Sequence, residues 1–355
     1  MSTARRLLLA ALVLLLSGGA ARASPFAPND AFYRPFSTPD YQWYAPVMNL
    51  PSAWERSLGS SNVIVAVLDT GVMADTPDLA GRLLSPLSAT GSAPLDGTMN
   101  HHGTWVASAV GMTINNGIGG AGVGNFSILP ITVTDIFGSN TSSWIATGIH
   151  MAADAGARVI NVSHSTLNYG LLDQEAAYAR TKGALVFVAA GNSDGYNGMM
   201  GFDNLIFVSG TQRGDARWHE VLDATSIPPK TIGSTWGPFV DLSAPADDIL
   251  VADRTLAPSG YGLIHGTSFA APLAAGAAAL AWSIDPDLTA DQVLALLYDM
   301  AVDLGDLGRD DVFGHGRIDI GAVAAAAYAL TPEPATLALL AGGLAVLVVR
   351  RRRRG

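Results

Sequence analysis

The chain of 355 residues contains no cysteine. It therefore forms no disulfide, and cysteine-ligated zinc and thiol chemistry are excluded. Charged residues are also few, at 14% of the chain, whereas hydrophobic residues make up 49%. This hydrophobic content is ample for a large buried core, so the sequence predicts a globular body and not a disordered chain.

Positive charge is scarce in the body of the chain, because eight of the 20 Lys and Arg residues lie near its two ends. Residues 24–330 keep 12 basic and 29 acidic residues, which gives a net charge of −17. A surface this acidic repels nucleic acid and anionic membranes, whereas it suits cations. We therefore expect no nucleic-acid partner.

The N-terminal residues 1–23 have the pattern of an export signal. Arg5 and Arg6 precede the apolar run from Leu7 to Leu16, and Ala21-Arg22-Ala23 resembles a cleavage site. A retained anchor is the alternative, but this run is short for a membrane span. The sequence thus predicts an exported protein.

The C-terminal residues 331–355 have the pattern of a second targeting signal. Thr331-Pro332-Glu333-Pro334 leads into an apolar run from Ala335 to Val349, and Arg350 to Arg354 follow. This order resembles a PEP-CTERM sorting tail. Fifteen apolar residues rise about 22 Å as a helix, less than a hydrocarbon core of ~30 Å, and the arginines oppose translocation. An ordinary C-terminal anchor is the alternative.

The resemblance to a sorting tail implies where the protein works and what it meets there. It implies a sorting machinery that recognises the tail, and contact with a membrane only through this C-terminal segment. The expected location is the cell envelope, the cell surface or the extracellular matrix of a bacterium.

Between these ends, short β-branched runs alternate with alanine-rich helical stretches. The sequence predicts strands at 63–68, 128–133, 159–163, 185–189 and 205–209, and helices from 102, over 142–155 and over 171–182. Continuous apolar strands separated by helices indicate a parallel sheet covered on both faces. We expect one α/β domain over 24–330, a three-layer α/β/α fold with a mostly parallel central sheet.

One further apolar segment, Phe269 to Trp282, invites a membrane assignment. Fourteen residues are too few to span a bilayer. The segment is therefore predicted to be a central buried helix.

Three short motifs supply an acid, a base and a nucleophile in one chain. In chain order they run from Val65 to Gly71, from His102 to Ala107 and from Gly266 to Pro272. Their order, Asp69, His102, Ser268, separates the subtilisin arrangement from chymotrypsin-like and α/β-hydrolase enzymes. Each residue alone is more typical of a cap or a turn, but their joint occurrence is not. The chain resembles the subtilisin-like serine protease family.

The resemblance implies a role for each of four residues. Ser268 is the nucleophile, His102 is the general base and later acid, and Asp69 orients the imidazole. The run ending in Gly191-Asn192 resembles the family's oxyanion segment, so that the Asn192 amide donates to the tetrahedral intermediate together with the Ser268 N–H. The implied activity is that of an exported serine endopeptidase, which hydrolyses polypeptide substrates through an acyl-enzyme.

Two more segments match the edges between which the family holds an extended peptide. They are Gly138, Ser139 and Asn140, and Ser163, His164 and Ser165. Such binding is strand addition, which gives affinity without strong sequence demands. The family usually has glycine where this chain has Ser165 and Thr166, and the added Cβ groups would narrow the cleft.

A calcium site is implied by the loop from Thr113 to Val123, which is similar to the family's high-affinity calcium loop. Asp78 matches the carboxylate ligand and Asn116 the amide ligand, and the backbone ligands would be Ile114, Ile118 and Gly120. Calcium takes six to eight oxygen ligands, which a loop rich in Gly and Asn can present. A plain Asn-Gly turn is the alternative.

Two other functions use the same fold. A catalytically silent surface or matrix protein would keep the fold for binding, although the presence of all four catalytic residues argues against it. An esterase or peptide ligase would use the same acyl-enzyme. The sequence has no recognisable acceptor site for a ligase.

Overall fold

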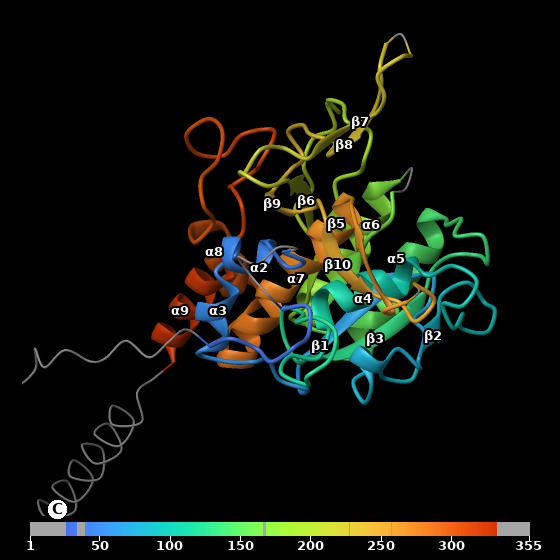
Figure 1. Ribbon diagram of the computed structural model, residues 1–355, viewed down its shortest axis with the longest axis vertical. Coiled ribbons are helices and arrows are strands. Elements are labelled where there is room, and N and C mark those ends of the chain that lie inside the picture. The colour runs from blue at the N-terminus through green and yellow to red at the C-terminus, as the bar shows by residue number, and fades with distance from the viewer. Residues whose placement is uncertain (1–25, 34–39, 166–167, 227, 257, 332–355) are drawn as a thin grey trace, which may run out of the picture.

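The computed structural model describes residues 26–33, 40–165, 168–226, 228–256 and 258–331. The export signal expected at 1–23, and all but the first residue of the tail expected at 331–355, lie outside these residues. The described chain is built around a seven-stranded sheet, and Figure 1 shows it at the centre of the molecule.

The seven strands of this sheet are all parallel. In spatial order they are β2 (Leu87–Ser88), β3 (Ser127–Thr132), β1 (Ile64–Asp69), β4 (Val159–Val162), β5 (Leu185–Ala189), β6 (Leu205–Thr211) and β9 (Leu242–Pro245). Asp69 pairs with Thr132 of β3, and Leu68 pairs with Val162 of β4. The carboxyl ends of β3, β1 and β4 therefore meet at one edge, where ligands of such sheets bind.

Helices cover both faces of the sheet, and β1 shows how. Alternate side chains of a strand point to opposite faces. Val65 and Val67 belong to one core, beneath α4 and α7, whereas Ala66 and Leu68 belong to the other, beneath α5 and α6. These helices are α4 (His102–Gly111), α5 (Ser142–Asp154), α6 (Tyr169–Thr181) and α7 (Thr267–Ile284). The predicted three-layer α/β/α fold is confirmed.

Helix α7 fills the centre of the core on its side of the sheet. Among the described residues it is the one helix long and apolar enough to cross a membrane, yet 83% of it is buried inside the protein. Four shorter helices pack on or near it: α2 (Tyr44–Val47), α3 (Leu50–Trp54), α8 (Ala290–Asp299) and α9 (Ile320–Leu330). The segment from Phe269 to Trp282 is thus the buried helix that the sequence predicts.

Smaller elements lie outside the sheet. β7 (His219–Asp223) pairs with β8 (Lys230–Gly233), and β10 (Ile249–Ala252) pairs with β11 (Tyr261–Ile264), both antiparallel. A single 3-10 turn, η1, covers Pro77–Leu79. Figure 1 shows the β7 and β8 pair at the top, beyond β6 and β9, whereas β11 leads directly into α7.

Candidate active site

Asp69 is placed at the edge of the sheet by the strand that precedes it. It is the last residue of β1 and is fully buried. The chain turns at Gly71, whose φ is +91°, and an added Cβ there would lie 2.2 Å from the Leu95 carbonyl oxygen. Only glycine fits this turn, which holds the Asp69 side chain at the carboxyl end of the sheet.

The Asp69 carboxylate is held by hydrogen bonds. It accepts from the Thr70 N–H at 2.8 Å and from Nδ1 of His102, which lies 2.8 Å from Oδ1 and 3.0 Å from Oδ2. Burial disfavours the charged carboxylate, but the charges of His102 and His164 and the hydrogen bond from His102 outweigh burial and hold the pKa of Asp69 well below its ordinary value. Asp69 is therefore ionised.

His102 is the first residue of α4, and its backbone N–H donates to the Asn100 side-chain oxygen at 3.1 Å. Burial lowers the pKa of His102, but the charge and hydrogen bond of Asp69 outweigh burial and raise it above its ordinary value. Because Nδ1 donates to Asp69, the lone pair of the neutral ring is on Nε2. His102 can thus accept a proton on the nitrogen that faces away from Asp69.

Ser268 is the second residue of α7 and is buried. Its Oγ donates to the Ser163 carbonyl at 3.2 Å, and Ser163 Oγ donates in return to the Ser268 carbonyl at 2.8 Å. The Ser268 carbonyl is free for this contact because Pro272, four residues on, has no N–H. We expect rotation of the Ser268 side chain to exchange the contact with Ser163 for one with His102 when substrate binds.

Asn192 lies just beyond β5, and its amide is fixed in one orientation. Its Oδ1 accepts from the Thr267 N–H at 3.0 Å and from Thr267 Oγ1 at 2.8 Å. Nδ2 is therefore turned toward Gly266, where an added Cβ would lie 3.3 Å from it. This leaves an N–H donor beside Gly266, two residues before Ser268, and that its role is to bind an oxyanion stays a prediction.

The first predicted substrate edge, Gly138, Ser139 and Asn140, lies in the loop between β3 and α5. Asp135 closes this loop, because its Oδ1 accepts from the N–H groups of Phe137 and Ser139, both at 2.9 Å. Phe137 is 80% exposed at the tip. That these residues bind peptide stays a prediction.

The second predicted edge, Ser163, His164 and Ser165, follows β4. Ser163 contacts Ser268, and His164 points to Asp69, with Nε2 3.2 Å from Oδ1. Ser165 is exposed. The sequence assigns these residues only to substrate binding and does not predict the contacts of Ser163 with Ser268 and of His164 with Asp69. The signal lies in the topology, because β4 is the neighbour of β1.

The predicted calcium loop closes on Asp78, a fully buried residue of η1. Its Oδ1 accepts from Asn116 Nδ2 at 2.8 Å, and its Oδ2 accepts from the Gly120 N–H at 3.2 Å. Burial raises the pKa of Asp78 to about 6, and the charge of Asp30 adds to this rise. The loop thus gathers two carboxylates, which repel each other unless a cation or a proton is present.

The groups around Asp78 fit a calcium ion if one amide turns. Asn116 presents Nδ2 to Asp78, while its Oδ1 accepts from the Ile118 N–H at 3.0 Å. A half-turn of this amide would place its oxygen beside the Asp78 oxygens, and the loss of the Ile118 contact would oppose it. Ile114, Ile118 and Gly120 lie in the same loop, and their roles as backbone ligands stay predictions.

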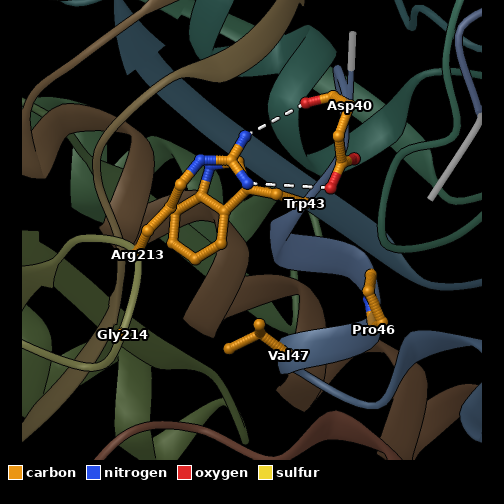
Figure 2. A pocket seen from close by; sticks show the side chains of 6 residues that line it. All are labelled: Asp40, Trp43, Pro46, Val47, Arg213 and Gly214. Atoms are coloured by element: carbon orange, nitrogen blue, oxygen red, sulfur yellow. Dashed lines mark hydrogen bonds and ion pairs between the residues drawn. The ribbon is translucent and has the colours of Figure 1, made fainter. Parts of the chain in front are cut away.

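A separate pocket of about 460 Å³ is lined by Asp40, Trp43, Pro46, Val47, Arg213 and Gly214. Figure 2 shows the Arg213 guanidinium lying over the Trp43 ring, 5.0 Å from its centre, and facing Asp40. Arg213 Nη1 is 3.6 Å from an Asp40 carboxylate oxygen. These contacts tie the segment before α2 to the turn at Gly214, and none of the predicted site residues lines this pocket.

Comparisons with known proteins agree with this geometry. The model of the subtilase family matches residues 60–316, and the model of the PEP-CTERM protein-sorting motif matches residues 330–354. Thermitase of Thermoactinomyces vulgaris is 35% identical over 261 residues, which are 72% of this chain and 85% of thermitase.

A second relative is longer than this chain. The halolysin-like extracellular serine protease Nep of Natrialba magadii is 32% identical over 319 residues, which are 86% of this chain. The chain spans about half of that relative, namely 53% of its length.

Solved structures share the fold. A protease from Pseudoalteromonas arctica gives a TM-score of 0.69 at 26% identity and covers 85% of this chain and 100% of its own. A lanthipeptide protease gives a TM-score of 0.68 at 22% identity, over 86% of this chain and 99% of its own. The latter likeness concerns the fold alone.

Proposed function

The chain belongs to the subtilase family, and on this premise we propose that it is an exported serine endopeptidase. The observation that carries the proposal is the ionised Asp69, whose hydrogen bond of 2.8 Å fixes His102 as a base. Asn192 supports it with an amide donor beside Gly266. Asn192 bonds to Thr267, and the His102 ring lies 6.1 Å from the Phe269 ring, so both groups lie beside the first turn of α7, which carries Ser268.

In the proposed reaction His102 Nε2 takes the proton of Ser268 Oγ as this oxygen attacks the peptide carbonyl carbon. The oxygen that becomes negative accepts from Asn192 Nδ2 and from the Ser268 N–H. His102 then gives its proton to the leaving amine, and an acyl-enzyme remains. Water attacks that ester by the same steps, with His102 again as base, and releases the acid.

For the substrate we propose an extended polypeptide. Its backbone would pair with Gly138, Ser139 and Asn140 on one side and with the backbone of residues 163–165 on the other. The hydrogen bonds of Asp135 support this, because they hold the first edge in a fixed shape. Contacts through the backbone would give broad sequence tolerance.

We also propose a structural calcium ion at the loop of Asp78 and Asn116. The support is a buried carboxylate with a raised pKa and a second carboxylate, Asp30, close to it. Calcium there would tie η1 to the loop that follows α4. It would act on stability and take no part in the reaction.

The sorting motif at 330–354 indicates an exported protein. We propose that residues 1–23 are removed as an export signal and that 24–330 form the peptidase domain. The tail, 331–355, would be handled by a sorting machinery and would be the chain's only membrane contact. The folded body would then work at the envelope, the surface or the matrix of a bacterium.

The test of this function uses casein and a fluorophosphonate probe. We expect the protein to cleave casein and to react with the probe, and Ser268→Ala to abolish both. Cleavage that persists in Ser268→Ala would overturn the assignment. A protein that takes up no probe and cleaves no casein would instead favour the silent binding protein.

A further inference from the structure

Asp69 faces two histidines, and only one of them is needed for the reaction. His164 Nε2 lies 3.2 Å from Asp69 Oδ1, the same oxygen that His102 Nδ1 approaches to 2.8 Å. The three ligand atoms all lie within 4.8 Å of one another. Among the residues that the structure describes, no other group of three His, Asp or Glu side chains is so close.

The contact of His164 with Asp69 is close but poorly aligned. Nε2 of His164 is buried and has no hydrogen-bond partner of acceptable geometry, although a carboxylate oxygen lies 3.2 Å away. The side chain is 13% exposed, so water does not readily take the place of that partner. A buried nitrogen in this state calls for an explanation, and an ion that shares it with Asp69 is one.

The donor set suits one class of ion. Two imidazole nitrogens and a carboxylate oxygen are ligands of zinc and of neighbouring transition metals, whereas calcium and magnesium prefer oxygen alone. Zinc holds such ligands at ~2.0–2.2 Å, which puts them about 3.3 Å apart. The distances of 2.8 Å and 3.2 Å at Asp69 are near this spacing.

We propose that Asp69, His102 and His164 form a binding site for a divalent transition metal such as Zn²⁺, which reversibly switches the protease off. This inference rests on the proposed function, because two of the ligands belong to the triad. The net charge of −17 over residues 24–330 favours the approach of a cation. His164 is the ligand that the reaction does not need.

Inhibition follows from the tautomer of His102. A metal ion at Nδ1 takes the lone pair there, and the single proton of the neutral ring is then on Nε2. Nε2 cannot accept the proton of Ser268 Oγ while it carries its own. No bond to carbon forms or breaks and nothing is oxidised, so removal of the metal restores the first tautomer and the activity.

Other histidines differ from His164 in their partners. His101 has its Nδ1 2.6 Å from an Asp253 oxygen, and His150 has its Nδ1 2.9 Å from a Glu175 oxygen. His150 lies on the surface of α5, with 46% of its side chain exposed. It is the matched control for zinc that binds to surface histidines.

Binding is tested first without proteolysis, in the full chain carrying Ser268→Ala. Calorimetric titration with zinc chloride is expected to show one site, and adding His164→Leu or His164→Gln is expected to weaken it about tenfold or more. Adding His150→Gln leaves this site in place. Equal zinc affinity with and without His164 would overturn the proposal, and a thermal melt identifies any variant that fails to fold.

Activity is tested next, in the chain with Ser268 intact. Zinc is expected to stop cleavage of a fluorogenic peptide, and a chelator is expected to restore it. Each variant is compared with its own rate without metal, and His164→Gln should need about tenfold more zinc for half inhibition. The same zinc concentration for half inhibition with and without His164 would contradict the proposal. A protein that binds zinc through His164 but cleaves no peptide would instead refute the proposed function and leave the metal site standing.

Discussion

Asp69 and Asp78 are both fully buried aspartates, yet their pKa values move in opposite directions. Burial alone raises the pKa of each. Asp69 faces two imidazoles, which reverse the effect, whereas Asp78 faces uncharged donors and a second carboxylate, Asp30. Burial raises the pKa of both carboxyl groups, and the difference between them follows from their partners, which outweigh burial at Asp69 but not at Asp78.

The two sites differ accordingly in what they can do. The edge of the sheet keeps a permanent negative charge that fixes and polarises His102, which general base catalysis requires. The charge of Asp78 acts on Arg82, yet the pKa of Asp78 stays raised, so that a bound cation would stabilise its charged form. We propose that the first arrangement serves catalysis and that the second serves stability.

The largest effect is expected when the charge of Asp69 is removed. Asp69→Asn keeps the shape of the side chain but favours the wrong tautomer of His102, so kcat should fall about 10⁴-fold, the figure known for this substitution in another serine protease. Steady-state kinetics with a peptide substrate measure it. Asp291→Asn, at a side chain that is 82% exposed, is the control. A loss below tenfold for Asp69→Asn would show that its charge is not used.

The second-largest fall in kcat is expected when a proposed hydrogen-bond donor to the transition state is removed. Asn192→Ala removes one of the two proposed oxyanion donors, and kcat should fall ~10²–10³-fold with little change in KM. The loss should be smaller than that of Asp69→Asn, because the Ser268 N–H remains. A change in KM alone would instead make Asn192 a substrate-binding residue.

The acid limb of the activity profile measures the influence of Asp69 on His102. Catalysis needs neutral His102, and Asp69 raises the pKa of His102 above its ordinary value. The midpoint of the acid limb should therefore lie at a higher pH than the pKa of a free imidazole. Below this midpoint kcat/KM should fall tenfold per pH unit. In Asp69→Asn the midpoint should move to lower pH. A profile that is the same in both proteins would disprove the coupling.

The smallest effect is on stability, at Asp78. A chelator should lower the melting temperature, because a ligand at a hundredfold excess over its Kd contributes about 2.7 kcal/mol to the folded state. Differential scanning calorimetry with and without calcium measures it, and Asp78→Ala should remove the difference. An unchanged melt in chelator would reject the calcium site.

Much of the fold follows from the sequence, because it rests on runs of apolar residues. The strand predicted at 185–189 and the helices predicted from 102 and over 142–155 correspond to β5, α4 and α5 within one residue. The antiparallel pairs were not predicted. All four strands are short. β7 and β8 also carry charged residues and have little buried surface, so these two strands lack the apolar pattern that marks a strand.

The pairing of Asp69 with His102 also follows from the sequence, whereas the direction of the neighbouring side chains does not. The motif order predicts the pairing of Asp69 with His102, which the structure confirms at 2.8 Å. The sequence assigns His164 to an edge that pairs with peptide through the backbone and does not predict the direction of its ring, which points to Asp69 because β4 lies next to β1 in the sheet. Strand order is a property of long-range packing that a local pattern does not contain.

The most direct test of the central claim is the capture of the acyl-enzyme. The protein is mixed with an activated acyl ester, quenched in acid within the first turnover and measured by intact-mass spectrometry with peptide mapping. Our account predicts one acyl group per chain, attached to Ser268 and absent from Ser268→Ala. Turnover of the ester with no adduct on Ser268 would contradict it.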